Sequence, residues 1–234
     1  MFQIFCVFHK SIVDACYSNL TDQELSYITF VAVNESIPKE YSTARPYKFI
    51  KEWELPNYTN YHNDGIKEAS VLFHVHRNKL HEQYKWVGFC HYDMIFQKDS
   101  INNINKLIRL AVMNDYISLH NETYTNTMHR SWFQIYLLSI IEREFPRFFD
   151  LSLNRENTIP LFNAFIIHTN LFNKTLEFGE YMLPLLYPIC VSEPNRTDYG
   201  NFSSTFERVF GLVIAHLGNN IAQLDVIHDS TIRV

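Results

Sequence analysis

Residues 2–33, FQIFCVFHKSIVDACYSNLTDQELSYITFVAV, carry the alternation that decides the fold class. The run 2–8 is continuously apolar, as in a central strand that is buried on both faces. Helix-compatible residues fill 14–25, and a second apolar run rich in β-branched residues follows at 27–33. This strand, helix, strand order predicts an α/β protein with a doubly wound, mostly parallel sheet flanked by helices.

Polar residues follow both apolar runs directly. His9 and Lys10 come after the first run, and Asn34 and Glu35 come after the second. In open parallel sheets, ligands bind beyond the carboxyl ends of the strands. The sequence therefore places these polar side chains where a nucleotide would be expected.

The rest of the chain shows further periodic segments. Residues 38–65 are rich in Pro, Tyr and Asn and lack periodicity, which predicts a long loop over the active face. The other expected elements are an amphipathic helix over 66–84 with Asp64 as its N-cap, a strand over 85–93, a helix over 101–112, a helix over 131–145 stopped by Pro146, a strand or edge strand over 161–168, a helix over 170–186 closed by Pro188, and a helix over 203–217 ending at Gly218. No repeat or linker interrupts this order, which favours one domain.

Length and composition exclude several classes of protein. The 234 residues are 47% hydrophobic and only 19% charged, enough for one large domain with a substantial core. The net charge of −5, with no Lys/Arg run, argues against a general nucleic-acid binder. No apolar stretch approaches the ~18 residues of a transmembrane helix, and the first residues do not form a signal peptide. We therefore expect a cytoplasmic protein whose four scattered cysteines are reduced.

Familiar phosphate-binding motifs are missing. The chain has six glycines and contains neither the dinucleotide-binding G-x-G-x-x-G nor the P-loop G-x-x-x-x-G-K-[ST]. It also lacks the G-x-S-x-G of serine hydrolases. Dinucleotide oxidoreductases, P-loop kinases and hydrolases of that type are therefore disfavoured.

The strongest local signal for chemistry is WVGFCHYD at 86–93. A divalent cation that binds diphosphate takes a carboxylate at a strand end, supplemented by a neutral imidazole or a second carboxylate. Residues two apart on a strand point to the same side, so His91 and Asp93 can share one target. An aspartate that merely terminates a strand is the alternative reading of the same spacing.

Two neighbouring segments together resemble a family of polysaccharide-building glycosyltransferases. Residues 62–78, HNDGIKEASVLFHVHRN, match a helix of the form E-x-x-x-L-(Y/W)-x-x-(W/H)-(K/R)-N. Residues 87–92 match the strand V-G-(L/F)-C-H-Y that follows it, while 162–167 look like the family's N-M-F-I strand and 206–210 like its E-R-L-F helix. The resemblance extends roughly over 2–217.

One departure from the bacterial members of this family is informative. They continue H-Y-R-R, whereas this chain has Asp93 and Met94 after Tyr92. The resulting Y-D-M is closest to glycosyltransferase domains of large algal viruses (chloroviruses), where the motif resembles the metal-binding D-x-D of GT-A enzymes. For a viral protein, the expected location is the cytoplasm of the host cell.

The resemblance implies a single GT-A (Rossmann-like) domain over 1–234, with a nucleotide-sugar-binding half over about 1–100 and an acceptor-binding half over about 101–234. It implies a glycosyltransferase that moves a sugar from a UDP-sugar donor to a glycan acceptor with Mn²⁺ or Mg²⁺. The metal would bind Asp93, with His91 as a secondary ligand or orienting group. The expected donor contacts are Phe8, His9, Lys10, Asn34, Arg77 and Tyr92, although Arg77 also suits a solvated helix charge and Tyr92 also suits the core.

An inverting enzyme needs a carboxylate that takes the proton of the acceptor hydroxyl. Glu207 is the first candidate and Asp198, in the preceding loop, the second. Glu207 and Arg208 equally suit a structural pair. His216 and His228 are later candidates for a metal ligand.

A second function class fits the same residues. The chain would also suit a non-catalytic GT-A-like module that binds a sugar nucleotide or a glycan, as one domain of a longer polypeptide. Turnover of the donor, beyond its binding, separates the two classes.

Overall fold

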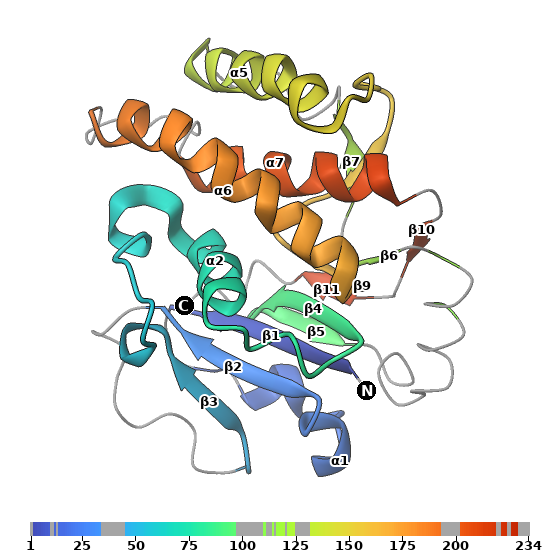
Figure 1. Ribbon diagram of the computed structural model, residues 1–234. Helices are drawn as coiled ribbons and strands as arrows, with labels where there is room; N and C mark the ends of the chain where they lie inside the picture. The colour runs from blue at the N-terminus through green and yellow to red at the C-terminus, as the bar shows by residue number, and fades with distance from the viewer. Residues whose placement is uncertain are drawn as a thin grey trace.

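The computed structural model describes residues 2–9, 12, 14–33, 45–96, 110, 114, 116–119, 121–124, 132–192, 202–218, 221–223 and 226–228. Most of the described chain belongs to one mixed sheet and the helices around it (Figure 1). The elements are β1 (Phe2–Phe8), η1 (Asp14–Tyr17), α1 (Asp22–Leu25), β2 (Ile28–Ala32), β3 (Lys48–Lys51), η2 (Glu52–Glu54), η3 (His62–Ile66), η4 (Lys67–Ala69), α2 (Ser70–Arg77), β4 (Trp86–His91), β5 (Met94–Phe96), β6 (Tyr116–Ser118), β7 (Asn121–Thr123), α5 (Trp132–Phe149), β8 (Thr158–Pro160), β9 (Phe165–His168), α6 (Thr169–Val191), α7 (Phe202–Leu217), β10 (Ile221–Gln223) and β11 (Val226–His228).

The central sheet has seven strands in the order β10-β6-β9-β4-β1-β2-β3. β1 is buried along its whole length and pairs in parallel with β2 on one side and β4 on the other, which confirms the central strand predicted for residues 2–8. β9 is antiparallel to both β4 and β6, and the other pairs of this sheet are parallel. The mostly parallel α/β sheet expected from the sequence is therefore confirmed.

The order of the strands reverses at β1. From β1 the chain passes to β2 and β3 on one side, and then crosses to β4 on the other. Such a reversal opens a crevice at the carboxyl ends of the two diverging strands, where open α/β sheets bind their ligands. The ends of β1 and β4 are consequently the first place to look for a site.

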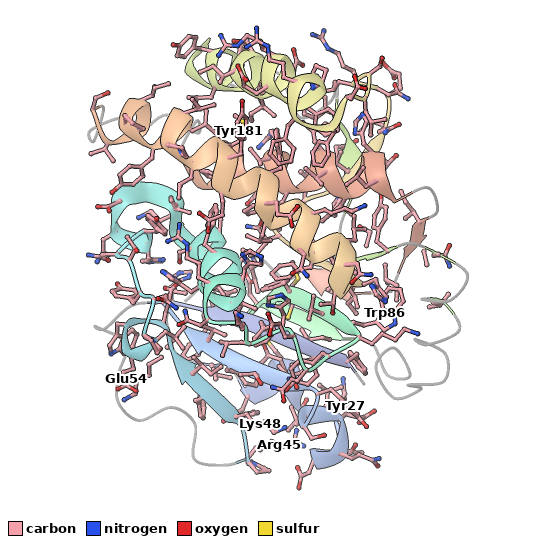
Figure 2. The ribbon with its side chains drawn as sticks, viewed as in Figure 1. Tyr27, Arg45, Lys48, Glu54, Trp86 and Tyr181 are labelled. Carbon is pink, nitrogen blue, oxygen red and sulfur yellow. The ribbon has the colours of Figure 1, made fainter. Side chains whose placement is uncertain are left out.

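Helices cover the sheet unequally. Figure 1 shows α2, α6 and α7 against one face, with α5 beyond them as an outer layer, and the short α1 on the opposite face. The larger core cluster lies on the α6 and α7 side, and the smaller cluster is built by alternate residues of β1 and β2 together with the segment around η1. Figure 2 shows Tyr181 of α6 directed toward α5, where its hydroxyl donates a 2.9 Å hydrogen bond to Glu144.

The segment 38–65 was predicted as a loop, and this is wrong for part of it. Lys48–Lys51 forms β3, the edge strand beside β2, and residues 62–66 form a turn of π-helix. The four residues of β3 are exposed or only partly buried, and buried and exposed positions do not alternate along it. They therefore lack the apolar run that indicates a central strand. Residues 34–44 of the predicted loop lie outside the described residues.

The predicted helix over 66–84 is shorter than expected. Its α-helical part is α2, and Lys67, with a φ of 53°, separates η3 from the following turns. Asp64 does not cap α2, because the N-cap position is Ala69 and the Asp64 carboxylate accepts a 2.6 Å hydrogen bond from Tyr187. The aspartate therefore ties η3 to α6.

Two helices continue through prolines that were expected to end them. α5 extends past Pro146 to Phe149, and α6 contains both Pro184 and Pro188. A proline removes one helical hydrogen bond and crowds the preceding turn, but tertiary packing can outweigh this cost. On α5, Phe145 and Phe149 both pack against Phe178 of α6.

Other expectations have a simpler outcome. α7 ends at Leu217, and Gly218 donates a 2.9 Å hydrogen bond to the carbonyl of Ile214, as predicted. The cysteines whose side chains are described, Cys6, Cys16 and Cys90, are buried free thiols. The predicted helix over 101–112 lies outside the described residues except for Leu110. None of the helices described is both long and apolar enough to cross a membrane.

Candidate functional site at the carboxyl ends of β1 and β4

Two histidines lie side by side where β1 and β4 end. His9 follows the last residue of β1, and His91 is the last residue of β4, paired in register with Val7. The main-chain N–H of Tyr92 continues this pairing with a 3.0 Å hydrogen bond to the carbonyl of Val7. The carboxyl ends of β1 and β4 therefore each carry an imidazole. Figure 2 marks this edge by Glu54, just beyond the end of β3, and marks the opposite edge by Trp86 at the start of β4.

Glu68 joins these two strand ends from the helical layer. It lies in η4, its carboxylate is 3.3 Å from Nδ1 of His9, and 20% of its side chain is exposed. Burial alone would raise its pKa, but the contact with His9 and the proximity of His91 outweigh burial, and the pKa falls to about 2. The carboxylate is therefore ionised at neutral pH. The sequence showed Glu68 only as a position of the family pattern, because nothing local indicates its proximity to either histidine.

Tyr92 belongs to the opposite layer. Only 4% of it is exposed, it packs in the smaller core cluster, and its ring meets that of His9 edge-on at 5.2 Å. The hydroxyl of Tyr17 donates a 2.8 Å hydrogen bond to the Tyr92 carbonyl. Tyr92 therefore supports the strand end from the core, as its alternating position suggested.

Asp93 lies in the turn between β4 and β5, where 2% of it is exposed. Because β4 ends at His91, the direction of the Asp93 side chain depends on this turn and not on the alternation of the strand that the spacing argument used. Burial, a hydrogen bond with Cys6 and the negative charge of Asp93 together raise the pKa of the Cys90 thiol. Asp93 is therefore near Cys90, and His91 is near Glu68.

These donors suit a divalent cation that is completed by its substrate. Among the residues described, no three His, Cys, Asp or Glu side chains gather closely enough to form a metal cage. Mg²⁺ and Mn²⁺ in nucleotide sites commonly bind one or two carboxylates and take their other ligands from phosphates and water. A buried carboxylate at Asp93 with an imidazole at His91 fits that donor set.

The C-terminal strand β11 reaches this corner through the backbone. It pairs antiparallel with β5, and His228 is the partner of Met94, the residue that follows Asp93. Tertiary structure therefore brings the backbone of His228 next to the corner, although Met94 and His228 lie 134 positions apart in the sequence.

His216 lies elsewhere. Its Nε2 accepts a hydrogen bond from the Asn154 main chain at 2.7 Å, and its Nδ1 is 2.8 Å from the Leu212 carbonyl. Both nitrogens of His216 are used within the fold.

Asn163 comes to the same edge on the other side of β4. β9 is antiparallel to β4 with Phe165 opposite Phe89, so the turn just before β9 lies where β4 ends. Phe162 and Asn163 form this turn with φ values of 55° and 49°. The side chain of Asn163 is 2% exposed, and neither of its amide atoms has a hydrogen-bond partner among the described residues. Sequence reasoning gave Asn163 no role, and included it only within residues 162–167 as part of the family's N-M-F-I pattern.

Helix α7 borders the site with its amino-terminal half. The Ala215 carbonyl accepts a hydrogen bond from Asn157 at 3.3 Å, and a Cβ on Gly211 would lie 2.8 Å from the Pro160 carbonyl. Asn157 thus contacts α7 near its end, at Ala215, and Pro160 contacts it one turn earlier, at Gly211. α7 also packs against η4, the turn that carries Glu68. Glu207 is partly buried, and only 3% of Arg208 beside it is exposed.

Two predicted donor contacts are already engaged inside the protein. Arg77 donates two 2.6 Å hydrogen bonds to the carboxylate of Glu180 and one of 2.9 Å to the Tyr61 hydroxyl. Phe8 is fully buried between Phe30 and Phe49. Arg77 is therefore held between α2 and α6, and Phe8 lies in the smaller core cluster.

The remaining candidates cannot be placed. Lys10, Asn34 and Asp198 lie outside the described residues. Of the ten sequence candidates in the site, the structure therefore places His9, His91, Tyr92 and Asp93 at the adjoining ends of β1 and β4, and it packs α7, the helix of Glu207, against η4.

Solved structures resemble this fold. The apo structure of the bifunctional glycosyltransferase WbbM aligns over 98% of this chain with a TM-score of 0.62 and 15% identity, and the chain spans 45% of WbbM. Core-mannan synthase A (CmsA/Ktr4) from Aspergillus fumigatus, in its Mn/GDP form, aligns over 97% of this chain and 74% of its own length, with a TM-score of 0.52 and 10% identity.

A glycosyltransferase involved in glycosylation of the major capsid of PBCV-1 covers 96% of this chain and 82% of its own length at 14% identity, but its TM-score of 0.37 is too low to support an argument. No family model and no curated protein matches the sequence. At these identities the likeness concerns the fold alone. The chain has the GT-A fold, the Rossmann-like fold of these glycosyltransferases, built on its mostly parallel seven-stranded sheet.

Proposed function

We propose that this chain is a glycosyltransferase that moves a sugar from a UDP-type donor to a glycan acceptor and depends on a divalent cation. The observation that carries the proposal is the pairing of His9 with the His91-Tyr92-Asp93 corner where the strand order of a GT-A sheet reverses at β1. That reversal is where nucleotides bind in open α/β sheets. The first hundred residues would bind the donor, and the later ones would complete the acceptor side.

In this proposal the strand ends hold the donor diphosphate. His9 and His91 would contact phosphate oxygens, while Glu68 holds the two strand ends in place. Mn²⁺ or Mg²⁺, bound by Asp93 and His91, would stabilise negative charge on the leaving nucleotide. His228, placed beside Met94 by the register of β11, is a candidate third ligand.

Transfer requires the acceptor oxygen to replace UDP at the anomeric carbon and to lose its proton. If the stereochemistry inverts, Glu207 on α7 is our candidate for the base that accepts this proton. Its helix packs on the face of the sheet opposite the Tyr92 layer. A Glu207→Gln variant would then bind donor normally while losing transfer.

Metal-dependent binding is the first test. We expect UDP with Mn²⁺ to stabilise the protein against heat, by about 2.7 kcal/mol at a concentration of one hundred times Kd, and EDTA to remove this effect. Asp93→Asn should abolish the metal-dependent part. Asp150→Asn, at an exposed position with a φ of 53° that asparagine tolerates, is the matched control and should behave as wild type. Absence of a UDP effect with either metal would overturn the donor assignment.

Turnover separates the enzyme from the binding module. Release of UDP from several UDP-sugars, with and without glycan acceptors, should be measured for wild type and Asp93→Asn. Binding without turnover across these donors would favour a non-catalytic GT-A-like module. Turnover that is equal in both proteins would remove Asp93 from the mechanism.

A further inference from the structure

Asn163 combines a left-handed backbone with a buried side chain that has no hydrogen-bond partner among the described residues. Its backbone has a φ of 49°, directly after Phe162 at 55°, and consecutive left-handed conformations are rare outside glycine. Its side chain is 2% exposed. Neither the amide nitrogen nor the amide oxygen has a hydrogen-bond partner among the described residues. Buried amides are nearly always hydrogen-bonded, so the Asn163 amide is an exception that calls for a partner.

A second buried polar group lies on the adjacent strand. Ser118 of β6 is the register partner of Phe165, and the next main-chain N–H, that of Leu119, donates a 3.0 Å hydrogen bond to Ala164. The Ser118 hydroxyl is fully buried and has no hydrogen-bond partner in the part of the chain described. Asn163, in the turn before β9, and Ser118, on the neighbouring strand β6, thus lie at the same end of the sheet, and neither side chain has a hydrogen-bond partner among the described residues.

The order of strands indicates what these groups would meet. β2, β1, β4 and β9 are consecutive neighbours in the sheet. The end of β2 is the side where the base and ribose are expected. His9 then follows at the end of β1, the His91 corner at the end of β4, and Asn163 just before β9. Neighbouring strands are ~4.8 Å apart, so Asn163 lies one strand spacing beyond the corner proposed for the diphosphate. In a nucleotide sugar, the group beyond the diphosphate is the sugar.

We propose that the Asn163 amide, supported by Ser118, binds hydroxyl groups of the donor sugar. This inference rests on the proposed function. An amide donates through its nitrogen and accepts through its oxygen, which matches hydroxyl groups that do both. A ligand that supplies both partners also explains why a buried amide without a partner stands at the strand end. Asn163 would therefore discriminate among donor sugars without contributing to affinity for the nucleotide alone.

The experiment compares UDP with UDP-glucose, UDP-galactose and UDP-N-acetylglucosamine by titration calorimetry in Mn²⁺. Wild type should bind at least one UDP-sugar more tightly than UDP. Asn163→Gly removes the amide while keeping the positive φ free of strain, and it should reduce this preference about tenfold and leave the affinity for UDP unchanged. Asn163→Asp keeps the size but cannot donate, and it should also lose the preference. Asp150→Gly, at an exposed positive φ, is the control for a glycine placed away from the site.

The outcomes separate the two proposals. If wild type does not bind UDP with metal, the proposed function falls and this inference falls with it. If wild type prefers a UDP-sugar and both Asn163 variants keep that preference, or if no UDP-sugar binds more tightly than UDP, only the sugar-binding role is overturned. A loss of UDP affinity in folded Asn163→Gly, verified by circular dichroism, would assign the residue to the shape of the crevice and also overturn that role.

Discussion

The hydroxyl of Tyr17 donates a 2.8 Å hydrogen bond to the main-chain carbonyl of Tyr92. Tyr17 is fully buried in η1, between β1 and β2, whereas Tyr92 begins the turn after β4. The same hydroxyl is 3.3 Å from the Cys6 sulfur. Burial raises the pKa of Tyr17 well above its usual value, so the phenol keeps its proton and remains a donor. The segment after β1 thereby holds the turn that carries Asp93.

Tyr17→Phe removes this donor while conserving the ring. We expect a loss of about 1 kcal/mol in the free energy of unfolding, the usual cost of a buried hydrogen bond, and weaker Mn²⁺-dependent binding of UDP because the turn is less well held. Urea unfolding and calorimetric titration measure the two effects. Tyr136→Phe, at a ring that is 49% exposed, is the matched control. Unchanged metal dependence in Tyr17→Phe would limit the hydrogen bond to stability.

Arg77 and Glu180 should behave as a structural pair. Their bidentate hydrogen bonds raise the pKa of Arg77, and both side chains are partly buried between α2 and α6. Arg77→Leu, Glu180→Leu and the double variant form a thermodynamic cycle for which we expect a coupling energy of about 1–3 kcal/mol. UDP affinity should not change. A selective loss of UDP affinity in Arg77→Leu, with little coupling, would instead restore Arg77 to the phosphate site.

Gly88 is required by close packing within the sheet. A Cβ at this position would lie 2.8 Å from Cγ1 of Ile166 and 3.1 Å from Cγ1 of Ile4. Gly88→Ala should therefore lower the free energy of unfolding by about 1–3 kcal/mol, measured by urea denaturation. The double variant Gly88→Ala, Ile166→Ala should be less destabilised than the sum of the two single variants, because Ile166→Ala makes room for the new methyl group. Simple additivity would show that the strand shifts to relieve the contact.

His216 should make the fold sensitive to mild acid. Burial lowers its pKa below the usual 6.5, despite the opposing effect of the Leu212 carbonyl, because the imidazole packs against Phe145 and accepts from Asn154. The unfolded chain then binds a proton more readily than the folded one, so stability is complete above pH 6.5 and falls as the pH decreases toward the lowered pKa.

His216→Gln, whose amide oxygen can accept from Asn154, should reduce this loss of stability between pH 7 and pH 5. Urea midpoints measured across that range test the effect. Part of the slope should remain, since burial also lowers the pKa values of His62, His76 and His168. A slope identical to that of wild type would show that His216 titrates normally in the folded protein.

Local pattern was sufficient for some elements and not for others. β1, β2 and β4 were predicted nearly to the residue, because a central strand buried on both faces must be continuously apolar. β3 was missed, since an edge strand with exposed residues has no such requirement. The ends of α5 and α6 were misplaced because packing between them compensates for the prolines that the local rule treats as stops.

The candidate site divides in the same way. His9, His91 and Asp93 were selected from the sequence, because polar residues directly after apolar strands must lie at the carboxyl edge of a parallel sheet. Glu68, Tyr17 and Asn163 were not selected for any role. Their places depend on how η4, η1 and the turn before β9 pack against those strand ends, and these contacts join residues far apart in the chain.

The sequence by itself thus determined the class of sheet, its central strands and the polar corner at His91-Tyr92-Asp93, since burial imposes a periodicity that can be read locally. Tertiary structure alone decided what surrounds that corner: the Glu68 carboxylate beside His9, the Tyr17 hydroxyl behind Tyr92, and the buried amide of Asn163 one strand beyond. The physical reason is that hydrogen bonds and ion pairs between distant segments leave no periodic trace in the chain, whereas hydrophobic burial does.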